Sequence, residues 1–263
     1  TCSCCYIDGF SVSGKKRNKH KLKSEYIFKP SNKVELQTAV NLWINNNESA
    51  RDTYRDINTW DTSAITDMSY MFFSFALTFN GDISDWDVSN VTDMRYMFRD
   101  AEEFIADISG WNVGSVTDMR YMFHSAKAFN ADISCWDVSS VTNMSYMFYN
   151  CSSLTSLDVS GFDTSSVTAM TSMFQSCTSL TDVIGVENFD IEGLNDLASF
   201  MFGVTLPTSR YDALLVNWDA QEPFDGMSPH FGNSKYTASS TAAAARANLI
   251  LNDGWSIVDG GTA

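Results

Sequence analysis

The sequence predicts an α/β solenoid of about six coils, closed by a helical N-terminal cap and an α/β C-terminal cap. At intervals of 25 to 28 residues the chain repeats an aromatic residue, then Asp or Asn, and then a run that ends in Met-Phe. A period of this length is typical of units that stack and bury a continuous core. The aromatic residues, which number the coils from one to six, are Trp60, Trp86, Trp111, Trp136, Phe162 and Phe189. The Met-Phe pairs begin at Met71, Met97, Met122, Met147, Met173 and Met201.

Each coil is expected to contain a short strand and a short helix. An aliphatic residue stands three positions before every aromatic one, and Leu154, Leu157 and Val159 have the L-x-x-L-x-L spacing of a leucine-rich-repeat strand. Downstream, the apolar positions recur as on one face of a short helix, with a Thr before them as candidate N-cap. In the second coil these positions are Val91, Met94, Met97, Phe98 and Ala101. Residues 57–205 are therefore predicted to form a leucine-rich-repeat-like stack with short strand plus short helix in each coil.

The segments that flank the coils predict two caps and an arm. Residues 33–56 predict a helical N-terminal cap, since their apolar residues lie on one helical face. Residues 206–263 predict a C-terminal cap with helices over 211–218 and 241–251 and a closing strand over 255–258. Residues 1–32 form a basic, Cys-containing arm that begins without an initiator Met or signal peptide. We therefore expect a processed chain or a fragment of a longer one.

The charge of the chain is distributed unevenly. The 263 residues carry a net charge of −15, yet residues 1–33 hold eight basic and two acidic residues, a balance of +6 that leaves −21 on the rest. Such an acidic body disfavours nucleic-acid binding by the repeats. The chain has no run of 18 apolar residues, so no transmembrane segment is predicted. We expect the arm to assemble with an acidic surface through Lys15, Lys16, Arg17, Lys19, Lys21 and Lys23.

Several motifs resemble one family of surface proteins. The fifth coil, residues 154–174, resembles the BspA-like, or Mycoplasma-type surface-lipoprotein, class of leucine-rich repeats, and the coils at Trp86, Trp111 and Trp136 are similar to its Trp-Asp-Val-Ser-x-Val-Thr-x-Met variant. Residues 28–43 look like the cap that precedes such repeats, and residues 211–260 contain motifs of the tail that follows them. The resemblance covers roughly residues 26–263. It implies a secreted or cell-surface protein of bacteria or protists that serves adhesion or recognition, with no shared enzyme activity and no particular ligand.

Three columns of acidic residues recur once per coil. The column beside the strand is the candidate ligand- or partner-binding face: Asp56, Asp82, Asp107, Asp132 and Asp158. Carboxylates about 4.8 Å apart repel one another, and Ca²⁺ or a basic partner would relieve the repulsion. The alternative is that these carboxylates accept backbone N–H bonds in turns and at helix starts, above all in the columns after the aromatic residue and after the Thr. No other metal and no cofactor is expected.

The cysteines and the Asn-x-Ser/Thr sequences are candidates for covalent modification. Cys151 and Cys177 share a core-facing repeat position, which predicts buried thiols. The disulfide candidates, to the body or to another subunit, are Cys2, Cys4, Cys5 and Cys135, with an exposed thiol as the alternative for Cys135. The glycosylation candidates are Asn47, Asn90, Asn143 and Asn150.

The sequence favours a binding or structural role over catalysis. The three histidines lie in different regions, and no catalytic motif is present, so no enzyme is expected. We expect a non-catalytic extracellular structural or adhesive protein that self-assembles through its basic N-terminal arm. The alternative is a cell-surface recognition module that binds a glycan or protein on the strand face of the solenoid. The partners are therefore copies of the chain or other extracellular proteins and glycans.

Overall fold

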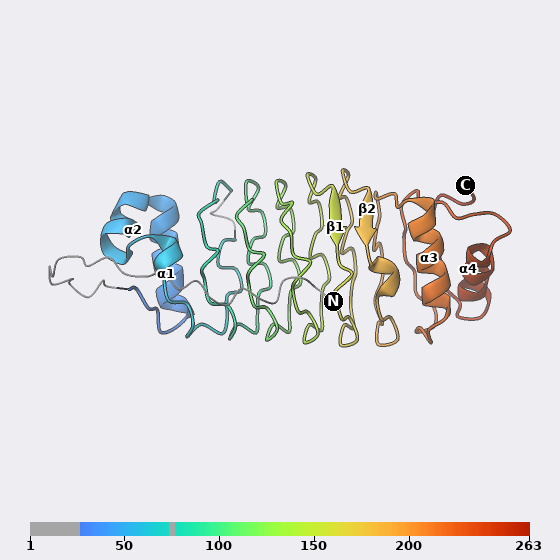
Figure 1. Ribbon diagram of the computed structural model, residues 1–263, viewed down its shortest axis with the longest axis horizontal. Coiled ribbons are helices and arrows are strands. Elements are labelled where there is room, and N and C mark those ends of the chain that lie inside the picture. Colours follow the sequence, from blue (N-terminus) through green and yellow to red (C-terminus); the bar gives the residue numbers. More distant parts are fainter. Residues whose placement is uncertain (1–26, 74–76) are drawn as a thin grey trace, which may run out of the picture.

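The coils lie side by side along an elongated molecule (Figure 1). The structure, a computed structural model, describes residues 27–73 and 77–263. Helices α1 (Lys33–Asn45) and α2 (Asn47–Tyr54) lie at one end, and α3 (Thr208–Asp219) and α4 (Thr241–Leu251) at the other. In the described ranges no helix is long and apolar enough to cross a membrane. The six cations predicted for the assembly arm, and Cys2, Cys4 and Cys5, lie outside the described residues.

The first cap is joined to coil one by side chains of α1. Asn32 accepts the N–H of Glu35 at 3.1 Å, and the Glu35 carboxylate accepts the N–H of Ser31 at 2.8 Å, so α1 begins with a reciprocal cap. Its apolar face buries four residues over the first coil: Leu36, Ala39, Val40 and Trp43. The Lys33 ammonium lies 2.8 Å from Asp67 of that coil. The end of the stack is thereby covered by a polar-faced helix.

Backbone hydrogen bonds join successive coils through the segment that leads to Met-Phe. The N–H groups of Met94, Tyr96 and Phe98 donate to carbonyl oxygens of coil three at 3.0, 3.1 and 2.9 Å. Equivalent residues form one parallel bridge per junction: Asp67, Asp93, Asp118, Asn143, Ala169 and Asp196. Because these N–H groups point to the neighbouring coil, they do not bond back along their own chain. The predicted short helix is therefore wrong: Tyr96 and Asp100 are left-handed, at φ 60° and 61°, and the segment consists of turns.

The tryptophan side chains join the coils on the opposite wall. Trp86, Trp111 and Trp136 each donate the indole N–H to a carbonyl oxygen of the preceding coil, at 2.9, 3.1 and 3.2 Å. Phenylalanine lacks this donor, so coils five and six need another link.

Between coils five and six, where Phe189 leaves the indole bridge missing, strands β1 (Ser156–Asp158) and β2 (Asp182–Ile184) pair in parallel. At the junction of coils four and five the described residues have neither an indole bridge nor a strand pair. In the described residues β1 and β2 form the one strand pair, so the strand predicted for every coil is wrong for the coils with a tryptophan. Two 3₁₀ helices, Ile57–Thr59 and Val186–Asn188, occupy the same part of coils one and six. Membership of the leucine-rich-repeat class stays a prediction.

The core is a set of aromatic and apolar columns. Phe98 and Phe123 stack at 5.6 Å within 3° of parallel, and the series continues through Phe148 to Phe174. In coil six the predicted Met201-Phe202 pair is one residue out of register. Phe174 donates its N–H to the carbonyl of Phe200, so Phe200 and Met201 fill the buried positions while Phe202 is 46% exposed. One more residue separates Phe189 from Met201 than separates Phe162 from Met173, so alignment on the Met-Phe pair places coil six one residue out of register.

The second cap continues the stack and ends it. Met201 donates its N–H to His230, and Phe231 to Val258, so the cap adds further chain segments to the last coil. The predicted closing strand is limited to an isolated bridge at Val258. Beneath α4, the Asp259 carboxylate accepts from the Tyr211 hydroxyl and from Arg246, both at 2.7 Å. This nearly buried carboxylate ties α3, α4 and the C-terminal segment together.

Candidate functional site

The aspartates of the strand-side column shape the corners of the coils. Asp82, Asp107, Asp132 and Asp158 each accept the backbone N–H of the serine two residues later, at 2.9–3.1 Å. Asp56 makes the corresponding contact to Asn58 at 3.4 Å. The other two columns do the same, as Asp87 does with Ser89 and Asp93 with Arg95, both at 3.0 Å. Every column therefore has a local role in turning the chain.

In the described residues, two of the three acidic columns carry an ion pair at their first residue alone. In the column after the aromatic residue, Asp61 lies 2.6 Å from Lys29, whereas Asp87, Asp137 and Asp163 pair with no cation of the described residues. The strand-side column has the same arrangement. Asp56 lies 3.3 Å from Arg51, whereas among the described residues no cation pairs with the next four, which we call the acidic column: Asp82, Asp107, Asp132 and Asp158. Hydrogen bonds from the following serines lower the pKa of the first three, although Asp107 opposes this effect at both Asp82 and Asp132. The first three carboxylates are therefore ionised at neutral pH, and Asp107 repels both of its neighbours. In the described part of the chain no group of three or more acidic, Cys or His side chains is placed to hold a metal.

Shallow hollows lie along the acidic column. One of about 330 Å³ lies between coils four and five and is lined by Asp132 and Asp158, and another of about 250 Å³ lies beside Gly110 and Cys135. Gly110 leaves open space where a side chain would project. These hollows are open to solvent and place the carboxylates within reach of a ligand.

The column after the Thr is neutralised, in contrast to the acidic column. Asp67 pairs with Lys33 at 2.8 Å, Asp93 with Arg95 at 2.9 Å and Asp118 with Arg120 at 3.0 Å. Burial raises the pKa of Asp93, and the contact from Arg95 partly offsets it. Cations of the coils are therefore concentrated on this wall.

Two aromatic columns run along that same wall. Tyr70, Tyr96, Tyr121 and Tyr146 stack with centroids 4.5, 4.6 and 4.5 Å apart, within 10° of parallel. In the adjoining column, Arg99 lies 5.3 Å from the Phe73 ring and 5.5 Å from Tyr96, and His124 stacks on Tyr149 at 4.6 Å. We call this surface the tyrosine–arginine face: Tyr70, Phe73, Arg95, Tyr96, Arg99, Arg120, Tyr121, His124, Tyr146 and Tyr149. It presents ring edges, phenol hydroxyls and guanidinium groups to solvent.

The backbone explains where the tyrosines stand but not why they are tyrosines. All four have a left-handed φ between 59° and 61°, which is unfavourable for a bulky residue. Ser172 and Ser199 hold the same conformation in coils five and six, at φ 52° and 55°. The fold therefore accepts serine here, and four consecutive strained tyrosines indicate a role at the surface.

Charge supports the same conclusion. Between residues 56 and 209 the sequence has four basic residues, and three of them, Arg95, Arg99 and Arg120, belong to this face. Burial raises the pKa of Tyr96 and Tyr121, so their hydroxyls stay protonated. Sequence reasoning missed this face because the Tyr was treated as one more repeat position. The cluster of arginines in coils two and three was the available signal.

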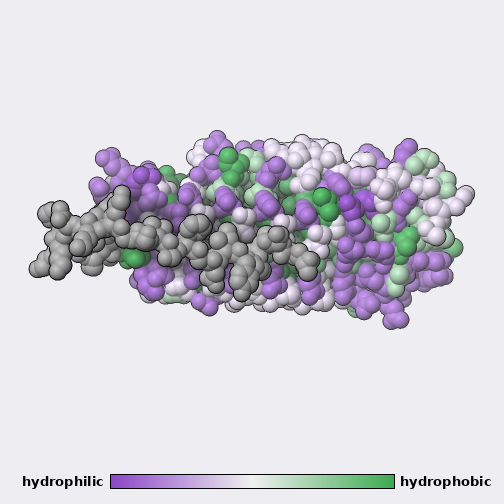
Figure 2. Space-filling view, in the orientation of Figure 1, coloured by the Kyte–Doolittle hydropathy of each residue, from purple (hydrophilic) through white to green (hydrophobic). Residues whose placement is uncertain are grey.

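The acidic column and the tyrosine–arginine face lie on opposite walls of the coils. The Trp86 ring packs 5.8 Å from Phe72, so the wall with the indoles and the wall with Met-Phe meet across the core. Asp82 and Tyr96 are also 14 residues apart in a coil of about 25. The acidic column and the tyrosine–arginine face are therefore exposed to solvent on opposite sides of the stack. Figure 2 shows hydrophobic residues scattered among polar ones on the visible part of the surface.

The cysteines and sequons have distinct environments. Cys151 and Cys177 are buried free thiols, as predicted, which donate to carbonyl oxygens of the preceding coil at 3.1 and 2.9 Å. Burial raises the pKa of both, that of Cys177 to about 12. Cys135 is exposed and is not a free thiol.

Asn47 and Asn90 are exposed, but Asn90 donates its Nδ2–H to the Ser63 carbonyl at 3.0 Å. Asn143 accepts the N–H of Ser145, and Asn150 donates to Ser125. A glycan therefore fits the sequon at Asn47 best.

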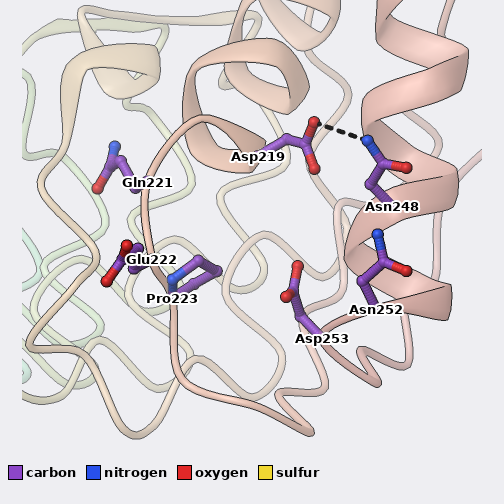
Figure 3. A pocket seen from close by; sticks show the side chains of 7 residues that line it. All are labelled: Asp219, Gln221, Glu222, Pro223, Asn248, Asn252 and Asp253. Carbon is purple, nitrogen blue, oxygen red and sulfur yellow. Dashed lines mark hydrogen bonds between the residues drawn. The ribbon is translucent and has the colours of Figure 1, made fainter.

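A further polar hollow, of about 340 Å³, lies in the C-terminal cap (Figure 3). Asp219 at the end of α3 accepts a hydrogen bond from Asn248 of α4 at 3.3 Å, and Glu222 and Asp253 stand nearby. Burial, and repulsion by Asp219 and Asp225, raise the pKa of Asp253. The hollow is open and acidic, and it belongs to the cap rather than to the repeated surface.

The coils and their surface columns define a stacked-repeat protein that presents periodic faces along its length. The family model described as "Mycoplasma protein of unknown function, DUF285" matches residues 41–157, 104–213 and 131–242. These overlapping matches cover more than half of the chain, so the chain belongs to this family, and their repetition agrees with a repeat protein. Membership is consistent with the BspA-like resemblance without establishing it. No curated protein and no solved structure matches the chain.

Proposed function

We propose that this protein is a non-catalytic extracellular structural or adhesive solenoid of the BspA-like, leucine-rich-repeat type, which binds other proteins through its tyrosine–arginine face. The observation that carries the proposal is the stack of four left-handed, solvent-facing tyrosines beside three arginines. Tyrosine and arginine dominate the energetic centres of protein interfaces, because they combine large contact area with directional polar groups. Stacking also fixes the rings before binding, which lowers the entropy lost on association.

The test replaces tyrosines by the residue that the same repeat position already holds elsewhere. The full chain with Tyr96→Ser and Tyr121→Ser should lose at least tenfold in affinity for intact cells of the organism that produces it. Ile105→Thr is the matched control, since Ile105 is 60% exposed and the equivalent residue of coil five is Thr155. Protease treatment of the cells should abolish binding of the unaltered chain. Unchanged binding by the double-serine variant would remove the support for this face.

Self-assembly through the basic arm is the second candidate function. The balance of +6 in residues 1–33 against −21 in the rest favours it, as does an acidic column that lacks ion pairs among the described residues. Replacing the six cations between Lys15 and Lys23 by Gln should then dissolve assemblies seen by light scattering. Recognition of a glycan or protein on the strand face has the hollows beside Asp132 as its support. Such binding would survive the double-serine change.

A further inference from the structure

The two opposite faces carry complementary chemistry. The tyrosine–arginine face offers hydrogen-bond donors, since each tyrosine has a hydroxyl and each arginine a fork of five N–H groups. All three arginines already lie beside an aspartate: Arg95 and Arg120 approach theirs through Nε at 2.9 and 3.0 Å, and Arg99 lies 3.4 Å from Asp100. Their remaining N–H groups are the donors that this face offers. The acidic column offers acceptors, because Asp107, Asp132 and Asp158 each use one oxygen in the corner and have no cation among the described residues. The second oxygen of Asp82 already accepts from Asn58 at 3.3 Å.

The two faces also repeat once per coil. Tyrosines occupy coils one to four and recur every 4.5–4.6 Å along the stack. Four consecutive carboxylates stand on the same repeat: Asp82, Asp107, Asp132 and Asp158. Because both columns advance by one coil at each step, four donors on one molecule can meet four acceptors on another without loss of register. An unrelated acidic partner would have to reproduce this spacing by chance.

We infer that the partner of the tyrosine–arginine face is a second copy of this chain, bound through its acidic column. This inference rests on the proposed function of the face as a protein-binding surface, and it identifies the protein that the face binds. Phenol hydroxyls and guanidinium groups of one rod would face carboxylates of the next, with the stacked rings between them. Since the two faces differ and lie on opposite walls, the contact is heterologous and repeats from molecule to molecule. The product is a sheet or bundle of rods lying side by side.

Electrostatics sets the conditions for this association. Copies that each carry −15 repel at long range, while the short contacts between the faces attract. Low ionic strength strengthens the repulsion between copies, and high ionic strength weakens the exposed ion pairs. We expect association to be strongest at intermediate salt. Individual exposed ion pairs are weak, so affinity should depend on the tyrosines and on the number of coils in register.

Two complementary variants of the full chain test the inference. The face variant carries Arg95→Ser, Arg120→Ser and Tyr121→Ser, residues found at equivalent positions in Ser69, Ser145 and Ser172. The column variant carries Asn at three aspartates, which keeps the corner hydrogen bond, as Asn112 does with Gly114 at 3.2 Å. The substitutions are Asp107→Asn, Asp132→Asn and Asp158→Asn. Production in bacteria avoids glycosylation of the Asn-x-Ser sequences that they create.

Sedimentation velocity gives the readout. The unaltered chain should form concentration-dependent oligomers, and each variant should remain monomeric to at least tenfold higher concentration with a urea midpoint close to that of the unaltered chain. An equimolar mixture of the two variants should form dimers and nothing larger, because each keeps one of the two surfaces.

Three results would overturn the inference: an unaltered chain that stays monomeric, variants that assemble like it, or a mixture that stays monomeric. If the double-serine chain still loses cell binding, only the identity of the partner fails and the binding face stands. If replacing the arm cations abolishes assembly while the face variant assembles normally, the arm is responsible instead.

Discussion

Replacing Trp111 by Phe tests whether the indole bridges hold the coils together. The change removes one buried hydrogen bond, from Nε1 to the Ile83 carbonyl at 3.1 Å, worth about 0.5–1.5 kcal/mol. The smaller ring also leaves a cavity, because the Trp111 side chain is only 4% exposed, and this cavity costs about 1–2 kcal/mol. We expect a total loss of about 2–3 kcal/mol in the free energy of unfolding. The ring itself is tolerated, since Phe162 occupies the position in coil five.

Trp60→Phe is the matched control for this measurement. Trp60 is 2% exposed and loses the same ring atoms, but within the described residues its Nε1 has no acceptor, because no coil precedes it. Replacing Trp60 also removes a buried donor that has no partner among the described residues, and burying such a donor costs about 1–3 kcal/mol. The difference between the two variants is therefore the hydrogen-bond contribution plus that cost, about 2–4 kcal/mol. Urea unfolding followed by fluorescence and by far-ultraviolet circular dichroism measures both, with the m-value as a check on cooperativity. Equal losses for Trp111→Phe and Trp60→Phe would refute the bridging role.

Three other measurements follow from the corners, the thiols and the glycines. Hydrogen bonds from the following serine lower the pKa of Asp107. Its ionised form therefore stabilises the fold above the unfolded pKa of about 3.9, and this contribution is lost as the pH falls through the folded pKa. The urea midpoint should decrease as the pH is lowered below about 4, and it should decrease less steeply in Asp107→Asn. Cys151 and Cys177, buried and raised in pKa, should stay unmodified by a thiol reagent at about pH 8 until urea is added, as read by mass spectrometry. Gly232→Ala should lower the melting temperature sharply, since the new Cβ would lie 1.6 Å from a carbonyl oxygen, whereas Gly226→Ala, also left-handed but in open space, should cost about 1 kcal/mol.

The repeat period predicted which side chains are buried but not how the backbone connects the coils. Met94, Met97 and Phe98 are fully buried, yet their spacing fits a helix as well as a chain of turns. The deciding factor is where the N–H groups find acceptors, and acceptors on a neighbouring coil leave no periodic signal in the sequence. The loss of the indole bridges after coil four was predictable, since Phe162 and Phe189 stand in place of Trp. Strand pairing does not follow from this loss alone, because it occurs between coils five and six but not between coils four and five of the described residues.

The candidate site was predictable in part. The acidic column was singled out from the sequence, and its recurring Asp-x-Ser pattern already offered the turn interpretation that the structure gives it. The tyrosine–arginine face was missed because Tyr96 stands one residue before a buried Met-Phe pair and was assigned to the repeat rather than to the surface. Its left-handed backbone, which makes the Tyr unexpected, is a property that sequence does not display.

The indole bridges give the molecule a direction. Trp86, Trp111 and Trp136 each reach back to the coil made before them, so such a coil finds its acceptor, as it leaves the ribosome, on chain that has already been synthesised. The capping helices come first in the sequence and supply the starting surface. Growth can then proceed one coil at a time from the N-terminus, with only the newest coil exposed. A gene that duplicated one such unit would lengthen the protein without disturbing either end, because every added coil brings its own link to the one before.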